Sequence, residues 1–231
     1  MEVSLAVSLV APFPEPDDVR AQLEGVGTRL EFLHRVLRAG EAARRTAVPN
    51  DPTGTAGRRA YEAQVRALRE LHIEHEGWAR LVHGRLELVC RADRSVAMGV
   101  MVGNAATGQA RLVPRNARRR GVATEQVTRA NAGERASHVQ TALFVADAGP
   151  EGVALSEEET FALKTWFLVS FRTKVGDAVR IDCELSQPQR FEDGFVVEWG
   201  RRIPLPPLRM DGIEPLNDDG PGEIDIAVDF R

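Results

Sequence analysis

The spacing of apolar residues changes along this chain, and that change restricts the fold more than any other feature. Between Asp17 and Gly40 apolar side chains recur every three or four residues, and the same spacing returns from Tyr61 to about His72. This spacing predicts two amphipathic helices. After residue 85 the apolar residues come in short runs, which is typical of strands. The sequence therefore predicts an α+β fold: a mostly antiparallel sheet with the two N-terminal helices packed on one face.

Short apolar or alternating segments bounded by turn residues mark the strands. The predicted strands are 2–10, 85–90, 95–102, 141–146, 163–172, 178–185, 194–199 and 223–230. We expect 85–90 and 95–102 to form a hairpin. The run IPLPPL at 203–208 must be extended as well, because proline does not fit a helix interior. We expect one α+β domain over residues 1–210 and an acidic C-terminal segment, 211–231, that ends in an edge strand.

Three segments carry the most distinctive motifs: NDPTGTAGRRAYEAQVRALRE (50–70), LELVCRADRSVAMGVMVGNAATG (86–108) and VVEWGRRIPLPPL (196–208). Together they resemble an uncharacterised family of bacterial proteins, whose members share an AYxxxVRALRE helix, a strand ending in a GDxATG turn and a WxxxIxLPP segment. This chain has Asn104 where that turn carries aspartate. The resemblance implies a bacterial protein with one domain over most of these residues. It implies no activity.

Composition indicates a soluble protein. With 43% apolar and 28% charged residues among 231, disorder along the whole chain is excluded. The longest apolar stretch, Val3 to Phe13, is too short to span a bilayer and lacks the basic start of a secretory signal. Cys90 and Cys183 are too few for a disulfide framework and fall within predicted strands, so we expect buried thiols. We therefore expect a cytoplasmic protein that makes no membrane contact.

Arginine is concentrated in 103–120, a segment with almost no apolar periodicity that we expect to be an exposed loop. Guanidinium groups suit phosphate oxygens, so this segment favours binding to nucleic-acid phosphate without sequence preference. It contains no aromatic residue for base stacking, which favours a duplex over a single strand. Alternatively the arginines are solvated, or they pair with acids of the C-terminal half. The five arginines are Arg111, Arg115, Arg118, Arg119 and Arg120.

A second hypothesis concerns the proline run and the residues just before it. Extended proline-rich segments lose little entropy on binding, so this strip favours a protein-docking surface, with a protein partner or a second copy of the chain bound there. Alternatively, the aromatic residue of this strip, Trp199, packs in the core of the sheet. The docking candidates are Trp199, Arg201, Arg202, Pro204 and Pro206.

Carboxylates suggest an alternative, catalytic function. Asp182 and Glu184 are two residues apart on one predicted strand and so point to one face, and Asp147 ends an earlier strand. Acids converging at a sheet edge could hold Mg²⁺ for phosphodiester cleavage, as in a metal-dependent nuclease. The nuclease pattern needs a lysine on the same strand, which is missing. Arg180 lies on that face, and an ordinary charged outer face is the other interpretation.

Three histidines near the end of the second predicted helix suggest a metal site. His72 and His75 are three residues apart, so they could lie on one helix face and share an ion, with Glu76 or His83 completing the set. The zincin spacing is absent, however, and a helix C-terminus attracts histidine through its dipole. No nucleophile elbow, P-loop or dinucleotide motif occurs. The sequence thus predicts no cofactor and favours a non-catalytic accessory module that binds a macromolecular partner, or else a structural subunit of a protein complex.

Overall fold

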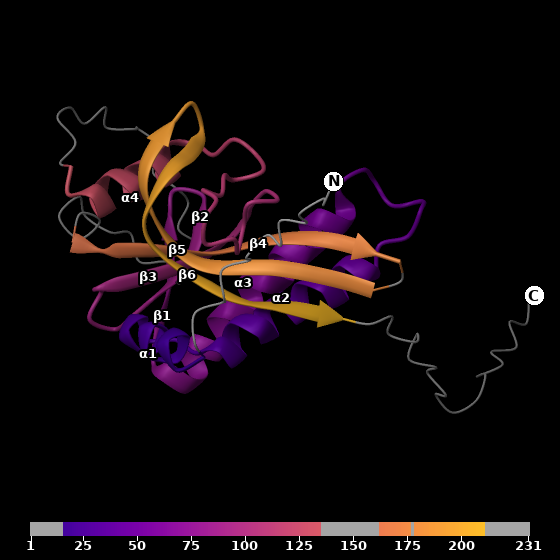
Figure 1. Ribbon diagram of the computed structural model, residues 1–231, viewed down its shortest axis with the longest axis horizontal. Coiled ribbons are helices and arrows are strands. Elements are labelled where there is room, and N and C mark those ends of the chain that lie inside the picture. The colour runs from indigo at the N-terminus through magenta and orange to yellow at the C-terminus, as the bar shows by residue number, and fades with distance from the viewer. Residues whose placement is uncertain (1–15, 135–161, 177, 211–231) are drawn as a thin grey trace, which may run out of the picture.

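The computed structural model describes residues 16–134, 162–176 and 178–210 (Figure 1). Four helices and six strands are present in these residues, so the predicted α+β class is confirmed. In chain order they are α1 (Pro16–Val26), α2 (Leu30–Arg45), α3 (Thr55–Glu76), β1 (Ala79–His83), β2 (Leu86–Cys90), β3 (Val96–Val102), α4 (Val122–Ala132), β4 (Lys164–Val175), β5 (Ala178–Glu192) and β6 (Phe195–Met210).

The six strands form one sheet in which spatial order follows chain order, from β1 to β6. Every neighbouring pair is antiparallel except β3 and β4, which are parallel. The mostly antiparallel sheet and the β2–β3 hairpin are thus confirmed. The segments 194–199 and 203–208 belong to a single strand, β6, and β1 was not predicted from the sequence. Register shifts between Gln187 and Phe191 accompany a curl of the β5–β6 hairpin beside α4 (Figure 1).

The first predicted helix is divided into α1 and α2 by a turn at Gly27. The amide of Thr28 donates to the carbonyl of Leu23 and that of Gly27 to the carbonyl of Glu24, which is the Schellman pattern of a helix end. Gly27 has φ +87°, a conformation that side chains with a Cβ rarely adopt. The apolar spacing runs on through this turn, so periodicity alone did not reveal it.

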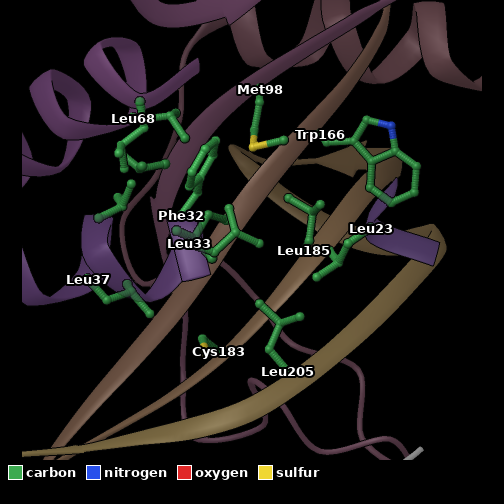
Figure 2. Packing of buried hydrophobic residues seen from close by; sticks show 14 of the residues in the cluster. Leu23, Phe32, Leu33, Leu37, Leu68, Met98, Trp166, Cys183, Leu185 and Leu205 are labelled. Atoms are coloured by element: carbon green, nitrogen blue, oxygen red, sulfur yellow. The ribbon is translucent and has the colours of Figure 1, made fainter. Parts of the chain in front are cut away.

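The sheet has a buried cluster on each face. One contains side chains of α1, α2 and α3 together with alternate strand residues, so three helices take the place of the two expected (Figure 2). The other contains Val127 of α4 together with Met101, Phe167 and Trp199. Burial on both faces explains why β3 is apolar throughout and does not alternate. Residues of the first cluster include Leu23, Phe32, Leu33, Leu68, Met98, Trp166, Leu185 and Leu205.

Several predictions concern residues outside the described part of the chain. They are the strands at 2–10, 141–146 and 223–230, Asp147, and the acidic segment 211–231. Within the described residues, no helix has the length and apolar character required to cross a bilayer.

Both cysteines are buried free thiols, as predicted. Burial raises the pKa of Cys90, and burial together with Asp182 and Glu184 raises that of Cys183 to about 12. Because the thiolate is the reactive form, we expect neither residue to react with an aromatic disulfide reagent at mildly alkaline pH in the folded protein. Both should react after unfolding in denaturant. Rapid labelling of either thiol before unfolding would contradict this expectation.

Candidate functional site

The arginine-rich segment 109–120, called the arginine loop below, lies along β6 and is held to it by side chains. Asn116 is only 2% exposed, and its amide nitrogen donates to the carbonyls of Arg118 (2.7 Å) and Gly194 (3.1 Å). Its amide oxygen accepts from the backbone nitrogen of Val196 at 2.7 Å. One buried side chain therefore joins the loop to the β5–β6 hairpin.

Two side chains of β6 hold the first half of the arginine loop. The indole nitrogen of Trp199 donates to the carbonyl of Pro114 at 2.8 Å. Arg202 donates to the carbonyls of Leu112 (2.6 Å) and Gln109 (3.1 Å). Trp199 is 7% exposed and packs in the second cluster, so its ring is not available for protein docking. The structure corrects that expectation, because the aromatic ring supports the loop from within.

The carboxylate of Glu184 anchors this arrangement and is completely buried. It accepts from Arg202 Nε (2.9 Å) and Nη2 (2.7 Å), from Ser186 Oγ (2.5 Å) and from the backbone nitrogen of Gly108 (2.8 Å). These four donors satisfy both oxygens. Gly108 has φ +74°, and a Cβ there would lie 3.2 Å from the backbone of Cys183, so glycine is required where the chain passes over β5.

The predicted carboxylate pair does not form a shared site. Asp182 binds Arg180 at 2.7 Å, whereas Glu184 is bound to Arg202 under the arginine loop. The face that carries them is not an ordinary exposed surface, since the chain around Gly108 covers Glu184. The sequence offered one signal of this burial, an acid placed between the apolar Cys183 and Leu185. Nothing in the sequence singled out Asn116.

The positive charge of the arginine loop is not neutralised by ion pairs with the described residues. In the described part of the chain none of its five arginines forms an ion pair. Four are exposed. Arg120 is partly buried, and this burial lowers its pKa, although the nearby Tyr61 acts in the opposite direction. Moreover, residues 94–124 contain no acidic residue. The loop therefore presents an excess of positive charge to solvent.

Phe195 of β6 orients two of these groups. The guanidinium carbon of Arg115 lies 3.7 Å from the centroid of its ring, and that of Arg119 lies 6.0 Å from the same centroid. Arg119 Nε also donates to the carbonyl of Asp193 at 2.9 Å. A guanidinium stacked on a ring keeps its N–H groups directed outward around its edge. The stacking thus leaves Arg115 donors free for an external anion.

A shallow depression of about 360 Å³ lies beside the arginine loop, between the start of α4 and the tip of the β5–β6 hairpin. Arg119 and Arg120 line it, together with two acids, Asp193 and Glu125. Glu125 is paired with Arg129 at 2.8 Å. The depression therefore has two arginines and one carboxylate without an ion pair in the described residues, that of Asp193.

The three histidines do not converge. His72 is buried, with its two ring nitrogens bonded to the carbonyl of Leu68 (2.8 Å) and to Thr28 Oγ1 (2.9 Å). His75 packs against Phe32, and His83 pairs with Gln126. In the ranges that the structure describes, no group of three or more histidine, cysteine or acidic side chains is placed to bind a metal. The predicted shared metal site is therefore not formed there.

Burial lowers the pKa of His34, His72 and His83. The unfolded chain then takes up protons near pH 6.5 that the folded chain does not accept, so acid favours unfolding. We expect the thermal unfolding midpoint to fall as pH decreases from about 7.5 to about 5.5. His72→Gln should weaken this dependence and the exposed control His75→Gln should retain it. A midpoint that is constant or rises on acidification would contradict the expectation.

The proline run is extended within β6, as predicted, and β6 ends the sheet in the described residues. Arg201 is exposed, with its guanidinium carbon 5.3 Å from the centroid of the Trp166 ring. Pro204 and Pro206 are half-buried, and the carbonyl of Pro206 lies 3.0 Å from His34 Nε2. Docking of a protein on this strip stays a prediction.

Comparison with protein-family models found no match, and comparisons with curated proteins and with solved structures found none either.

Proposed function

We propose that this protein is a non-catalytic accessory module of the bacterial cytoplasm that binds duplex nucleic acid, without sequence preference, through the phosphate contacts of its arginine loop. One observation carries the proposal. The five arginines have no carboxylate partner in the described residues, although the loop that bears them is fixed by Asn116, Trp199 and Arg202.

A fixed loop favours binding because little backbone order has to be gained on contact. Each guanidinium that meets a phosphate releases condensed counterions, which is the main source of nonspecific affinity for a duplex. Phosphate contacts of this kind position a protein on nucleic acid and carry no sequence information. The ring of Phe195 is covered by Arg115, which disfavours base stacking on it.

The test is a salt titration of binding to a random duplex, followed by fluorescence anisotropy. Arg111 and Arg118 make no side-chain hydrogen bond or ion pair in the described residues, and Arg119 makes one hydrogen bond, to a backbone carbonyl. Changing these three to alanine therefore removes charge with little loss of packing. We expect binding at moderate salt to weaken about tenfold or more, and the salt slope to fall by about 3.

The matched control changes Arg35, Arg38 and Arg66 to alanine. These exposed arginines lie on α2 and α3. Replacing them removes the same net charge as the loop variant does. We expect the control to change affinity much less than the loop variant does. Equal weakening by both variants, or affinity independent of salt, would remove the proposal.

The alternative of a metal-dependent phosphodiesterase has less support. Both oxygens of Glu184 already accept hydrogen bonds, and the Arg202 guanidinium lies directly against them. A cation bound there would have to displace that guanidinium. The geometry therefore favours a structural role for Glu184.

A further inference from the structure

Two large apolar side chains project from the arginine loop. Leu112 is 49% exposed and Val113 is 61% exposed, and they lie between Arg111 and Arg115 in the sequence. In the part of the chain that the structure describes, six large apolar side chains are exposed, and no other two of them are adjacent in the sequence. Exposed apolar groups at a charged site indicate a contact surface.

The backbone of this pair is fixed on its inner side. The carbonyl of Leu112 accepts from Arg202, whose guanidinium is bound in turn to the buried Glu184. The following residue, Pro114, is buried, and its carbonyl accepts from the Trp199 indole. Burying the two side chains would require breaking these contacts, so the pair stays exposed at the surface of a rigid loop.

The charges around the pair indicate what it contacts. Arg111 and Arg115 flank it, and no acid lies within residues 94–124, so the partner is an anionic surface with apolar groups behind its charges. The minor groove of DNA combines these two features, because phosphates line its edges and the stacked bases lie behind them. Proteins that bind it place arginine among the phosphates and insert apolar side chains between base steps, which unstacks the step and kinks the duplex.

We propose that Leu112 and Val113 form an apolar wedge that enters the minor groove of a DNA duplex and partly unstacks one base step. This inference rests on the proposed function, which supplies the phosphate contacts on either side. The wedge has to open the step on a straight duplex. A duplex whose stacking is already disrupted avoids that cost and binds more tightly.

The experiment compares binding to a straight duplex with binding to the same duplex carrying a short unpaired bulge. The full chain is used, and anisotropy gives the two affinities. We expect the bulged duplex to bind at least about tenfold more tightly. Leu112→Ser with Val113→Ser should bring this ratio close to one while leaving the salt slope unchanged. The control Val48→Ser, at an exposed valine away from the loop, should keep the ratio.

Energy transfer between dyes at the two duplex ends gives a second readout. Wild-type protein should shorten the end-to-end distance of the straight duplex, and the double serine variant should not. Equal affinity for both duplexes, or a preference that survives the double substitution, would overturn the wedge while leaving phosphate binding intact. Absence of binding to either duplex would overturn the proposed function and the wedge with it.

A third arm uses vesicles of phosphatidylcholine with phosphatidylserine, because an anionic bilayer also accepts arginine beside apolar side chains. The wedge proposal expects weak vesicle binding that the double serine variant does not change. Vesicle binding that exceeds DNA binding and disappears in the double variant would assign the pair to a lipid surface and overturn the proposal.

Discussion

Replacement of Arg202 by methionine should lower the free energy of unfolding by about 3–5 kcal/mol, since it leaves a fully buried carboxylate without its counter-ion. Glu184 would keep only Ser186 and the amide of Gly108 as partners. Burying an unpaired charge costs far more than an exposed ion pair contributes. The arginine loop would also lose two backbone anchors, at Leu112 and Gln109.

Urea denaturation followed by tryptophan fluorescence measures this change. Arg180→Met is the matched control, because Arg180 forms an ion pair from a more exposed position on β5 and its loss should cost no more than about 1 kcal/mol. Adding Glu184→Leu to Arg202→Met should recover much of the loss, since an apolar pair can replace a buried ion pair. If Arg202→Met and Arg180→Met were equally destabilising, the buried pair would not be the anchor described above.

Arg172→Met should have the second largest effect, about 3 kcal/mol, because Arg172 neutralises Glu41, a second buried carboxylate. Arg172 Nε and Nη2 lie 2.7 and 2.9 Å from the two oxygens of Glu41, and this pair joins α2 to β4. Arg45 Nε lies 3.1 Å from Glu41 Oε1, and Arg45 is still present in the variant. Its ion pair with Glu41 should limit the loss of stability. Lys174→Met, at an exposed position on the same strand, is the control and should be nearly neutral.

The effect of Arg172→Met should depend on pH. Burial raises the pKa of Glu41, but the hydrogen bonds from Arg172 and Arg45 together outweigh burial and hold the pKa below its ordinary value. The stabilisation is therefore complete above the pKa of the unfolded chain and is lost as pH falls through the lower folded value. Denaturation curves should show the difference between wild type and variant shrinking below about pH 4. A difference that stays constant on acidification would contradict this role for the pair.

Apolar spacing predicted the α+β class and the positions of most strands, because both signals are local. Spacing could not show where one helix gives way to the next at Gly27, since the apolar pattern continues from Val26 to Leu30 across the turn. It also could not show that residues 195–210 form one strand, because Gly200, Arg201 and Arg202 interrupt the apolar runs. Pairing with β5 determines that continuity, and pairing is not a local property.

The candidate site was partly visible in the sequence. The density of arginine and the lack of neighbouring acids located the loop, but not the side chains that fix it. Asn116, Trp199 and Arg202 act through contacts to residues about 80 to 90 positions away, and no local pattern records such distances. Glu184 appeared as a catalytic candidate because a buried structural acid and a catalytic acid look alike in a strand.

The sheet has a consequence for the order of folding. Among the described strands, every antiparallel ladder joins neighbours in the chain, and the parallel β3–β4 ladder alone connects the first half to the second. Local ladders form readily, whereas closing the long connection between β3 and β4 is slow. The arginine loop belongs to the first half, but Glu184, Trp199 and Arg202 belong to the second. A nascent chain therefore carries the cationic segment early, and this segment acquires the conformation described here only when the two halves dock.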